Sequence, residues 1–105
     1  FDWERADQVR EKVREELQEL DEAIAAARGA PDPHIAEELG DVLFALTNWS
    51  VHLAIDPEEA LRAANAKFER RFRCMERLAA ERGASLTALT AAEWDTLWRE
   101  AKRRA

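Results

Sequence analysis

The sequence has few of the residues that break helices or cross-link small proteins. Its 105 residues include only three glycines, three prolines and one cysteine. The alternation of β-branched and aromatic residues that is typical of half-buried strands does not occur in it. Hydrophobic residues make up 47% and charged residues 36%, with abundant alanine, leucine, glutamate and arginine. This composition predicts an all-α protein.

Other absences restrict the compartment and the partners. There is no run of about 18 apolar residues and no signal-peptide pattern, so we expect neither membrane insertion nor secretion but a cytoplasmic protein. Cys74 is alone and cannot form an internal disulfide, so we expect a buried or half-buried, unreactive thiol. The net charge of −6 argues against a nucleic-acid partner.

The length predicts one domain, residues 1–105, with a modest core. The sequence opens at Phe1-Asp2-Trp3 without an initiating methionine, which suggests an excised domain. Trp3 is a candidate tether or lid over a nucleotide base, although an aromatic anchor for the first helix is the simpler interpretation.

Caps and helix breakers divide the chain into three longer helices and a short fourth. Asp32 before Pro33 and Asp56 before Pro57 are helix starts, and Thr90 with Glu93 forms a capping box. Glycines at positions 29 and 83 mark two helix ends. We therefore expect a first helix from residue 4 or 6 to 28, a second over 33–54, a third from 57 to 81 or 82, and a last helix from 91 through 102.

Each of the longer helices has an apolar stripe when its residues are placed at 100° intervals. We expect these stripes to be buried. The first stripe consists of Val9, Val13, Leu17, Leu20 and Ile24. The second consists of Leu39, Val42, Leu43, Leu46 and Leu53. The third consists of Leu61, Ala64, Phe68, Phe72, Met75 and Leu78 or Ala79.

Acidic residues border the first two stripes. If the two helices pack antiparallel, four carboxylates can converge on one point: Glu16, Glu19, Glu38 and Asp41. A salt-bridged surface is the ordinary alternative. However, no lysine or arginine follows these acids or Glu15 at three or four residues, and only Lys12 with Glu16 offers an intrahelical pair. Two like charges roughly 5 Å apart repel by about 0.8 kcal/mol in water and by more near a protein interior, so the cluster needs a cation.

The ligand type indicates which cation. Hard carboxylate oxygens without cysteine or convergent histidine favour Mg²⁺, with Mn²⁺ as an alternative, over zinc. Di-iron bundles use a Glu-x-x-His element, which neither histidine completes, because Pro31 precedes His34 and Trp49 precedes His52 by three residues. We expect His34 in a loop and His52 at a helix edge. Gly40, between two of the acids, indicates either close approach of a helix or phosphate, or simple tolerance of glycine.

The motifs together resemble the MazG nucleoside triphosphate pyrophosphohydrolases. The first motif is Glu-Glu-x-x-Glu at 15–19, and the second is Glu-x-x-Asp at 38–41 within Glu-Glu-Leu-Gly-Asp-Val-Leu-Phe-Ala-Leu. Segment 56–72 and the ending at 98–102 continue the likeness, which covers nearly the whole chain. The resemblance implies a four-helix MazG-like bundle whose core is completed by dimerisation, of the C-terminal MazG type.

The resemblance also implies an activity and its residues. Water attacks the α-phosphorus of an NTP or dNTP, with Mg²⁺ as cofactor, to release a nucleoside monophosphate and pyrophosphate in a house-cleaning role. The implied metal ligands are Glu16, Glu19, Glu38 and Asp41, and Glu15 or a ligand carboxylate such as Glu16 orients the water. Phosphate contacts are implied for Lys67, Arg71 and Lys102 and a nucleotide contact for Trp98; Lys12 and Asn65 complete the predicted substrate-binding set.

Other interpretations remain open. One is a narrower pyrophosphatase for dUTP, dCTP, a damaged nucleotide or phosphoribosyl-ATP. Another is a non-catalytic dimerisation or regulatory module, against which the intact acids at all five motif positions argue. We also expect a homodimer or a dimer of dimers, because a chain of this length cannot comfortably bury Trp49, Trp94 and Trp98.

Overall fold

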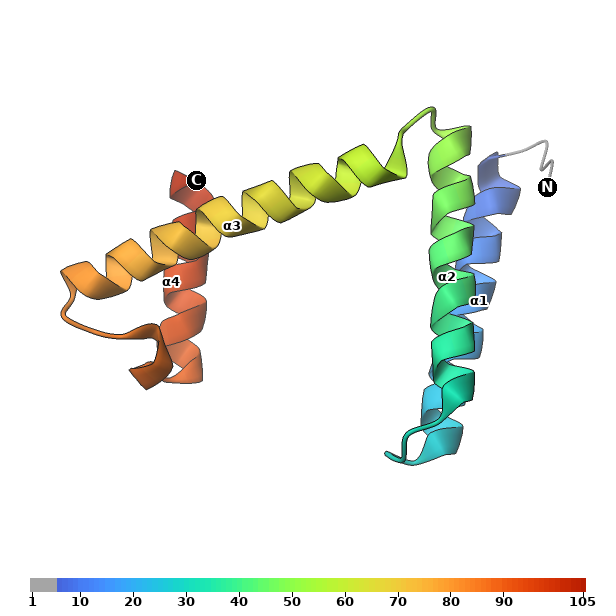
Figure 1. Ribbon diagram of the computed structural model, residues 1–105, viewed down its shortest axis with the longest axis horizontal. Coiled ribbons are helices and arrows are strands. Elements are labelled where there is room, and N and C mark those ends of the chain that lie inside the picture. The colour runs from blue at the N-terminus through green and yellow to red at the C-terminus, as the bar shows by residue number, and fades with distance from the viewer. Residues whose placement is uncertain (1–5) are drawn as a thin grey trace. The chain divides into compact units, whose positions relative to one another are not determined.

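The computed structural model describes residues 6–105, and within that range all regular structure is helical (Figure 1). The elements are α1 (Ala6–Ala27), α2 (Pro33–His52), α3 (Pro57–Glu81), the short 3₁₀ helix η1 (Leu86–Ala88) and α4 (Ala91–Arg104). The all-α prediction with three longer helices and a short fourth is confirmed. The role considered for Trp3, and a helix start before Ala6, lie outside the described residues. None of the described helices is long and apolar enough to cross a membrane.

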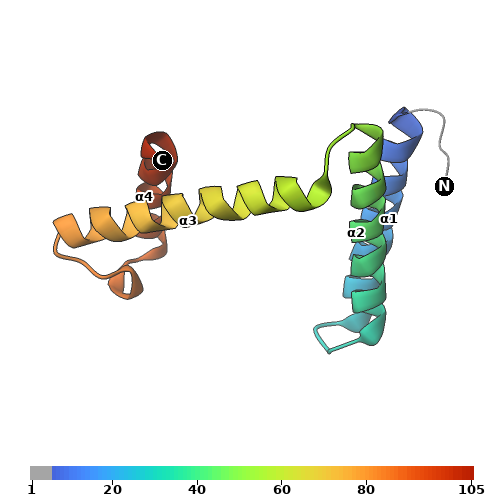
Figure 2. The ribbon, with the colours of Figure 1, turned by 45° about the horizontal axis from the view of Figure 1, so that its top comes forward.

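The chain divides into two compact units, and the boundary between them along the sequence follows Pro57, at the start of α3. In the first unit α1 and α2 run side by side in opposite directions, as both views show (Figures 1 and 2). Arg28 and Gly29 have φ values of 51° and 83°, so the left-handed backbone ends α1 one residue before the predicted end. Asp32 then caps α2 by accepting a hydrogen bond from the His34 backbone N–H at 3.0 Å. Ala54, with φ of 57°, ends α2 two residues earlier than predicted.

The faces that bury between α1 and α2 differ from the predicted stripes. On α1 the buried residues are Val9, Val13, Glu16 and Ala23, and on α2 they are Val42 and Ala45. The prediction was wrong for the large residues that remain exposed: Leu17, Ile24, Leu39, Leu43, Leu46 and Leu53. The apolar stripe of each helix is wide enough to contact two neighbouring helices, so one neighbour covers only part of it. The covered part is the side next to the acidic residues.

The second unit is built on the C-terminal half of α3. Its core consists of Cys74, Met75, Leu78, Ala79, Leu97 and Ala101, with Leu86, Leu89, Trp94 and Trp98 packed against it. In both views α4 lies across this half of α3 (Figures 1 and 2). The capping box predicted for α4 is confirmed, because Thr90 Oγ1 accepts from the Glu93 backbone N–H at 3.2 Å and Glu93 accepts from the Thr90 N–H at 3.0 Å.

The third predicted stripe is only half buried. The bounds of α3 agree with the prediction, and Cys74 is buried as expected. The N-terminal half of the stripe is nevertheless exposed, at 62% for Leu61 and 55% for Phe68, and Ala64 is exposed as well. Within this unit the core lies between α4, the loop and the second half of α3, and in the first half the Phe68 ring contacts Trp98 of α4.

Candidate metal centre

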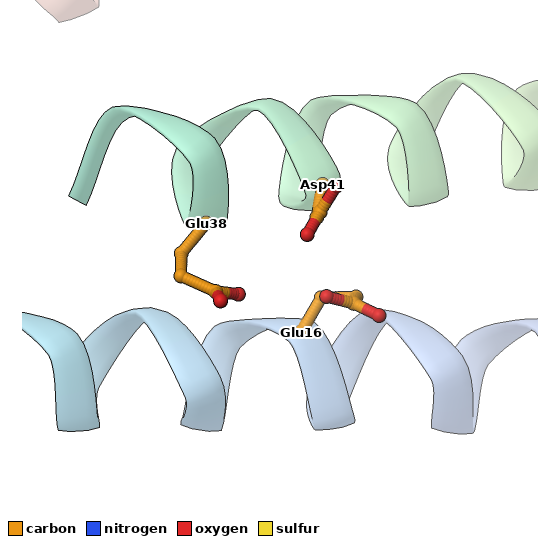
Figure 3. Close-up of side chains that lie close together, drawn as sticks. All are labelled: Glu16, Glu38 and Asp41. Atoms are coloured by element: carbon orange, nitrogen blue, oxygen red, sulfur yellow. The ribbon is translucent and has the colours of Figure 1, made fainter. Parts of the chain in front are cut away.

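The antiparallel packing of α1 and α2 brings three carboxylates together. Glu16 projects from α1 toward Glu38 and Asp41 of α2 (Figure 3). One oxygen from each of the three residues lies within 4.8 Å of the others. Three of the four predicted metal ligands therefore occupy one small volume between two helices.

The three carboxylates lie at graded depths. Glu16 is only 7% exposed, the Glu38 side chain is 13% exposed, and Asp41 is exposed. In the described part of the chain, the buried Oε2 atoms of Glu16 and Glu38 have no hydrogen-bond partner. A buried carboxylate oxygen without a donor or cation is costly, by more than the roughly 1–3 kcal/mol of an unpaired neutral group. The exposed Asp41 leaves one side open, as Mg²⁺ requires because it keeps several water ligands.

Lys12 is the cation beside this cluster. Its Nζ lies 3.0 Å from Glu16 Oε1 and 3.5 Å from Glu15 Oε2, so the prediction that it pairs with Glu16 alone was too narrow. The hydrogen bond to Glu16 is the main cause that raises the pKa of Lys12, opposed by burial and supported by the charges of both glutamates. One lysine engages one oxygen of Glu16 and leaves the other free.

Glu19 is exposed and lies outside the group of three. The charge of Glu16 raises the pKa of Glu19, with smaller contributions from burial, from the charge of Glu38 and from a hydrogen bond with Glu16. Glu19 and Glu38 also line one groove along the hairpin. The Glu19 carboxylate thus lies within electrostatic reach of the cluster. Glu15, with 59% of its side chain exposed, lies at the surface beside Lys12.

His34 is a neighbour of the cluster that the sequence analysis missed. It lies in the first turn of α2 and not in a loop as predicted. Its Nε2 is 3.4 Å from Glu38 Oε1, and its Nδ1 is 3.5 Å from Glu37 Oε2. The sequence carries a signal for this contact, because His34 precedes Glu38 by four residues and side chains at that spacing share one face of a helix.

The remaining predicted substrate-binding residues belong to the second unit. Asn65 and Lys67 lie on the exposed half of α3, and Lys102 is exposed on α4. Arg71 is half-buried, and its Nε atom is buried without a hydrogen-bond partner among the described residues. The use of these residues together with the acidic cluster stays a prediction, because the two units are described separately.

Trp98 is half-buried in the second unit. Its ring packs on Phe68 and Trp94, with centroid separations of 5.5 and 6.2 Å. Part of the Trp98 surface is therefore used in packing within this unit. The predicted contact with a nucleotide concerns the part that remains accessible.

The donor set is chemically suited to a hard divalent cation. The three clustered residues offer only carboxylate oxygens, and two of these oxygens are buried without a partner. Such a set matches the preference of Mg²⁺ or Mn²⁺ and lacks the thiolate or imidazole ligands typical of zinc sites. Glu16, Glu38 and Asp41, with Glu19 beside them, therefore fit a magnesium-type centre.

Comparison with known proteins places these residues in a wider context. Residues 5–75 match the family model of the MazG nucleotide pyrophosphohydrolase domain. The chain is 44% identical over 103 residues, 97% of its length, to a Thermotoga maritima protein named nucleoside triphosphate pyrophosphohydrolase/pyrophosphatase MazG. It is 42% identical over 105 residues, 98% of its length, to the Escherichia coli nucleoside triphosphate pyrophosphohydrolase. It is also 46% identical over 74 residues, 70% of its length, to the uncharacterized protein YabN of Bacillus subtilis. The chain spans 38%, 39% and 15% of these three relatives.

Proposed function

This chain belongs to the MazG nucleotide pyrophosphohydrolase family, and on that basis we propose that it hydrolyses nucleoside triphosphates to nucleoside monophosphates and pyrophosphate. The proposal includes Mg²⁺ as cofactor, held by Glu16, Glu38 and Asp41 with Glu19. It extends to NTPs and dNTPs as substrates, to a house-cleaning role in the nucleotide pool, and to a cytoplasmic protein without a nucleic-acid partner.

The observation that carries the proposal is the pair of unpartnered oxygens. Glu16 Oε2 and Glu38 Oε2 are buried, lack hydrogen-bond partners among the described residues, and belong to residues on facing helices. A purely structural carboxylate pair is ordinarily satisfied by donors, because an unpaired buried charge destabilises the fold. These oxygens favour a bound cation, and a cation beside an open groove favours a phosphate substrate.

The proposed reaction needs a group that accepts the proton of water and positive charge that stabilises the phosphates. The oxygen of water forms a bond to the α-phosphorus, the bond from that phosphorus to the bridging oxygen of the β-phosphate breaks, and pyrophosphate leaves. Mg²⁺, when bound, supplies neutralising charge and lowers the pKa of water. We assign orientation of the water and acceptance of its proton to Glu15 or Glu16, which lie beside the Lys12 ammonium.

We propose substrate-binding roles for the basic residues of the second unit as well. Lys67, Arg71 and Lys102 supply positive charge for the phosphate chain, because phosphoryl transfer depends on positioning and on charge stabilisation. The unpartnered Nε of Arg71 supports this assignment. Trp98 and Asn65 are assigned to the nucleoside, through stacking and hydrogen bonding respectively.

We propose a homodimer or a dimer of dimers as the active form. Large apolar side chains remain exposed on the hairpin and on α3, with Leu43 at 57% and Leu61 at 62%. Apolar surface of this extent on so short a chain favours an interface.

Product analysis tests the proposed reaction directly. The purified protein is incubated with each NTP and dNTP and with Mg²⁺, and products are separated by anion-exchange chromatography. We expect nucleoside monophosphate and pyrophosphate, and a Glu38→Gln/Asp41→Asn preparation controls for contaminating enzymes. Release of nucleoside diphosphate and phosphate would contradict the mechanism. Turnover confined to dUTP or dCTP would support the narrower pyrophosphatase instead.

A further inference from the structure

We propose that His34 is a positioning residue that holds Glu38 for the metal, by donating its Nε2–H to Glu38 Oε1 and leaving Glu38 Oε2 free to bind Mg²⁺. This inference rests on the proposed magnesium centre. It assigns a role to a residue on the rim of the acidic cluster that is not itself one of the clustered ligands.

The helix cap fixes the backbone of His34. Asp32 accepts the His34 N–H at 3.0 Å, and Pro33 occupies the first position of α2. The backbone of His34 is therefore constrained, and the residue lies about one helical turn before the carboxylate that its ring contacts, where residues four apart share a face. The cap thus sets both the start of α2 and the side of the helix on which the ring lies.

The contacts divide the two oxygens of Glu38. Its Oε1 lies 3.4 Å from His34 Nε2, whereas its Oε2 is buried without a hydrogen-bond partner among the described residues. The other ring nitrogen faces Glu37, whose side chain is 77% exposed and belongs to the solvated surface. Only the contact with Glu38, which is 13% exposed, reaches into the space between the helices.

The same arrangement occurs on the opposite helix. Lys12 precedes Glu16 by four residues and lies 3.0 Å from Glu16 Oε1, which leaves Glu16 Oε2 buried and unpartnered. In both helices a side-chain nitrogen one turn earlier lies beside Oε1, and Oε2 is buried without a hydrogen-bond partner among the described residues. Hydrogen bonds of this kind from outside the ligand set orient metal-binding carboxylates, and their loss typically weakens metal affinity 10- to 100-fold.

His34 is positioned to act without blocking the site. It is 56% exposed at its side chain and lies along the groove that Glu19, Glu22, Ala23 and Ala26 also line, so the ring is at the rim. A donor at the rim can restrict the rotation of Glu38 while solvent and substrate still reach the exposed Asp41.

Calorimetric titration of the protein with MgCl₂ tests the inference without relying on turnover. The variants are His34→Leu, which removes the donor, and His34→Gln, which restores an N–H of similar reach. Glu37→Gln is the matched control, because it removes the negative charge of the other residue that the ring contacts, at the exposed surface. Circular dichroism and the metal-free melting temperature report on the fold of each variant.

We expect His34→Leu to raise the Mg²⁺ dissociation constant about tenfold, with the helical content and metal-free melting temperature unchanged. His34→Gln should recover most of the affinity, and Glu37→Gln should stay within about twofold of wild type. Unchanged or tighter binding by His34→Leu, with wild type binding Mg²⁺, would overturn the role of His34 alone. Failure of wild type to bind Mg²⁺ would overturn the proposed metal centre and this inference together.

Discussion

Among the acidic residues, the two oxygens of a single carboxylate have different environments. Glu16 Oε1 faces Lys12 at 3.0 Å, while Oε2 is buried and unpartnered among the described residues. Glu38 repeats this division with His34. Carboxylates that served only as salt-bridge partners would gain from donors at both oxygens, so the asymmetry favours a second, cationic partner.

Single-residue substitutions of proposed ligands should abolish turnover and leave the helices intact. Glu19→Gln and Asp41→Asn each remove a negative charge at nearly constant shape, and loss of a ligand should cost 10- to 100-fold or more in kcat/KM. Steady-state kinetics with Mg²⁺ measures the loss, and circular dichroism checks the fold. Asp21→Asn, at an exposed acid on the same helix as Glu19, is the matched control and should stay active. More than about a tenth of wild-type activity in both variants would exclude these residues as ligands.

The raised pKa of Glu19 predicts a pH-dependent effect on stability. Glu16, burial and Glu38 raise this pKa above the unfolded value, so the folded state gains from protonated Glu19 at low pH and loses that gain as pH rises through the folded pKa. Metal-free Glu19→Gln should therefore melt higher than wild type at pH 7. The difference should vanish below about pH 4, where the carboxyl is protonated in both states. Differential scanning calorimetry in EDTA measures the melting temperatures of the two proteins at each pH. A lower melting temperature of the variant at pH 7 would contradict the proposed repulsion between Glu19 and its acidic neighbours.

At the level of the helices, the contact between α1 and α2 decides what the acids can do. The two buried faces include Glu16 and small residues such as Ala23 and Ala45, while the larger leucines lie to one side. Each helix turns its acidic edge, and not the middle of its apolar stripe, toward the other helix, so the carboxylates lie between them. The rest of each stripe is left as an apolar surface of the hairpin that is available for another contact.

Substitution of Gly40 tests two interpretations of this residue: simple tolerance of glycine, or close approach of a phosphate or a second chain. A Cβ at this position would meet no atom within 4 Å, so Gly40→Ala should stabilise α2 by up to about 1 kcal/mol. Chemical denaturation measures the free energy of unfolding. If the variant is more stable and fully active, glycine is merely tolerated. A folded variant that loses turnover or dimerisation would show that a phosphate or a second chain approaches Gly40.

On the scale of the whole molecule, exposed apolar area is the property that the single chain leaves unexplained. The tryptophans that motivated the dimer prediction, Trp49, Trp94 and Trp98, are half-buried. The large apolar side chains that are exposed are mainly aliphatic, with Val51 at 65% and Leu61 at 62%. Surface of this kind on a small protein ordinarily contacts a partner.

We expect light scattering at micromolar concentration to give two or four times the mass of one chain. Leu43→Glu places a charge on the exposed flank of α2 and should shift the protein toward monomer without loss of helical content, because Leu43 is 57% exposed within the chain. Gln18→Glu, at an exposed polar position of α1, is the control for added charge. A monomeric wild type would defeat the prediction.

Metal binding should stabilise the whole protein. A ligand that binds only the folded state adds about 2.7 kcal/mol at one hundred times its dissociation constant, so the melting temperature at pH 7 should climb with Mg²⁺. An ionic-strength-matched sodium salt should have a much smaller effect. Glu38→Gln/Asp41→Asn should lose the response and melt higher than metal-free wild type, because it removes repulsion. A lower metal-free melting temperature for this variant would mean that the acids stabilise the fold as salt-bridge partners.

The sequence by itself determined the helices, their caps and the acidic motifs. Signals such as Asp32 before Pro33 and the box of Thr90 with Glu93 act within one helical turn, so they can be recognised without knowing what packs where. The motif around Glu16 and Glu38 was equally local, and its spacing predicted carboxylates on one edge of each helix.

Only the tertiary structure decided which part of each apolar stripe is buried and which carboxylate oxygens are free. Hydrophobic periodicity gives the average direction of a stripe, but burial depends on how many neighbours cover it, and a single neighbour left Leu17 and Leu39 exposed. The division between Oε1 and Oε2 of Glu38 depends on side-chain packing between two helices and on the placement of His34 by its cap. The spacing of His34 and Glu38 on one helix is a local signal, but the packing between α1 and α2 that leaves one oxygen of Glu38 buried is not specified by any local pattern in the chain.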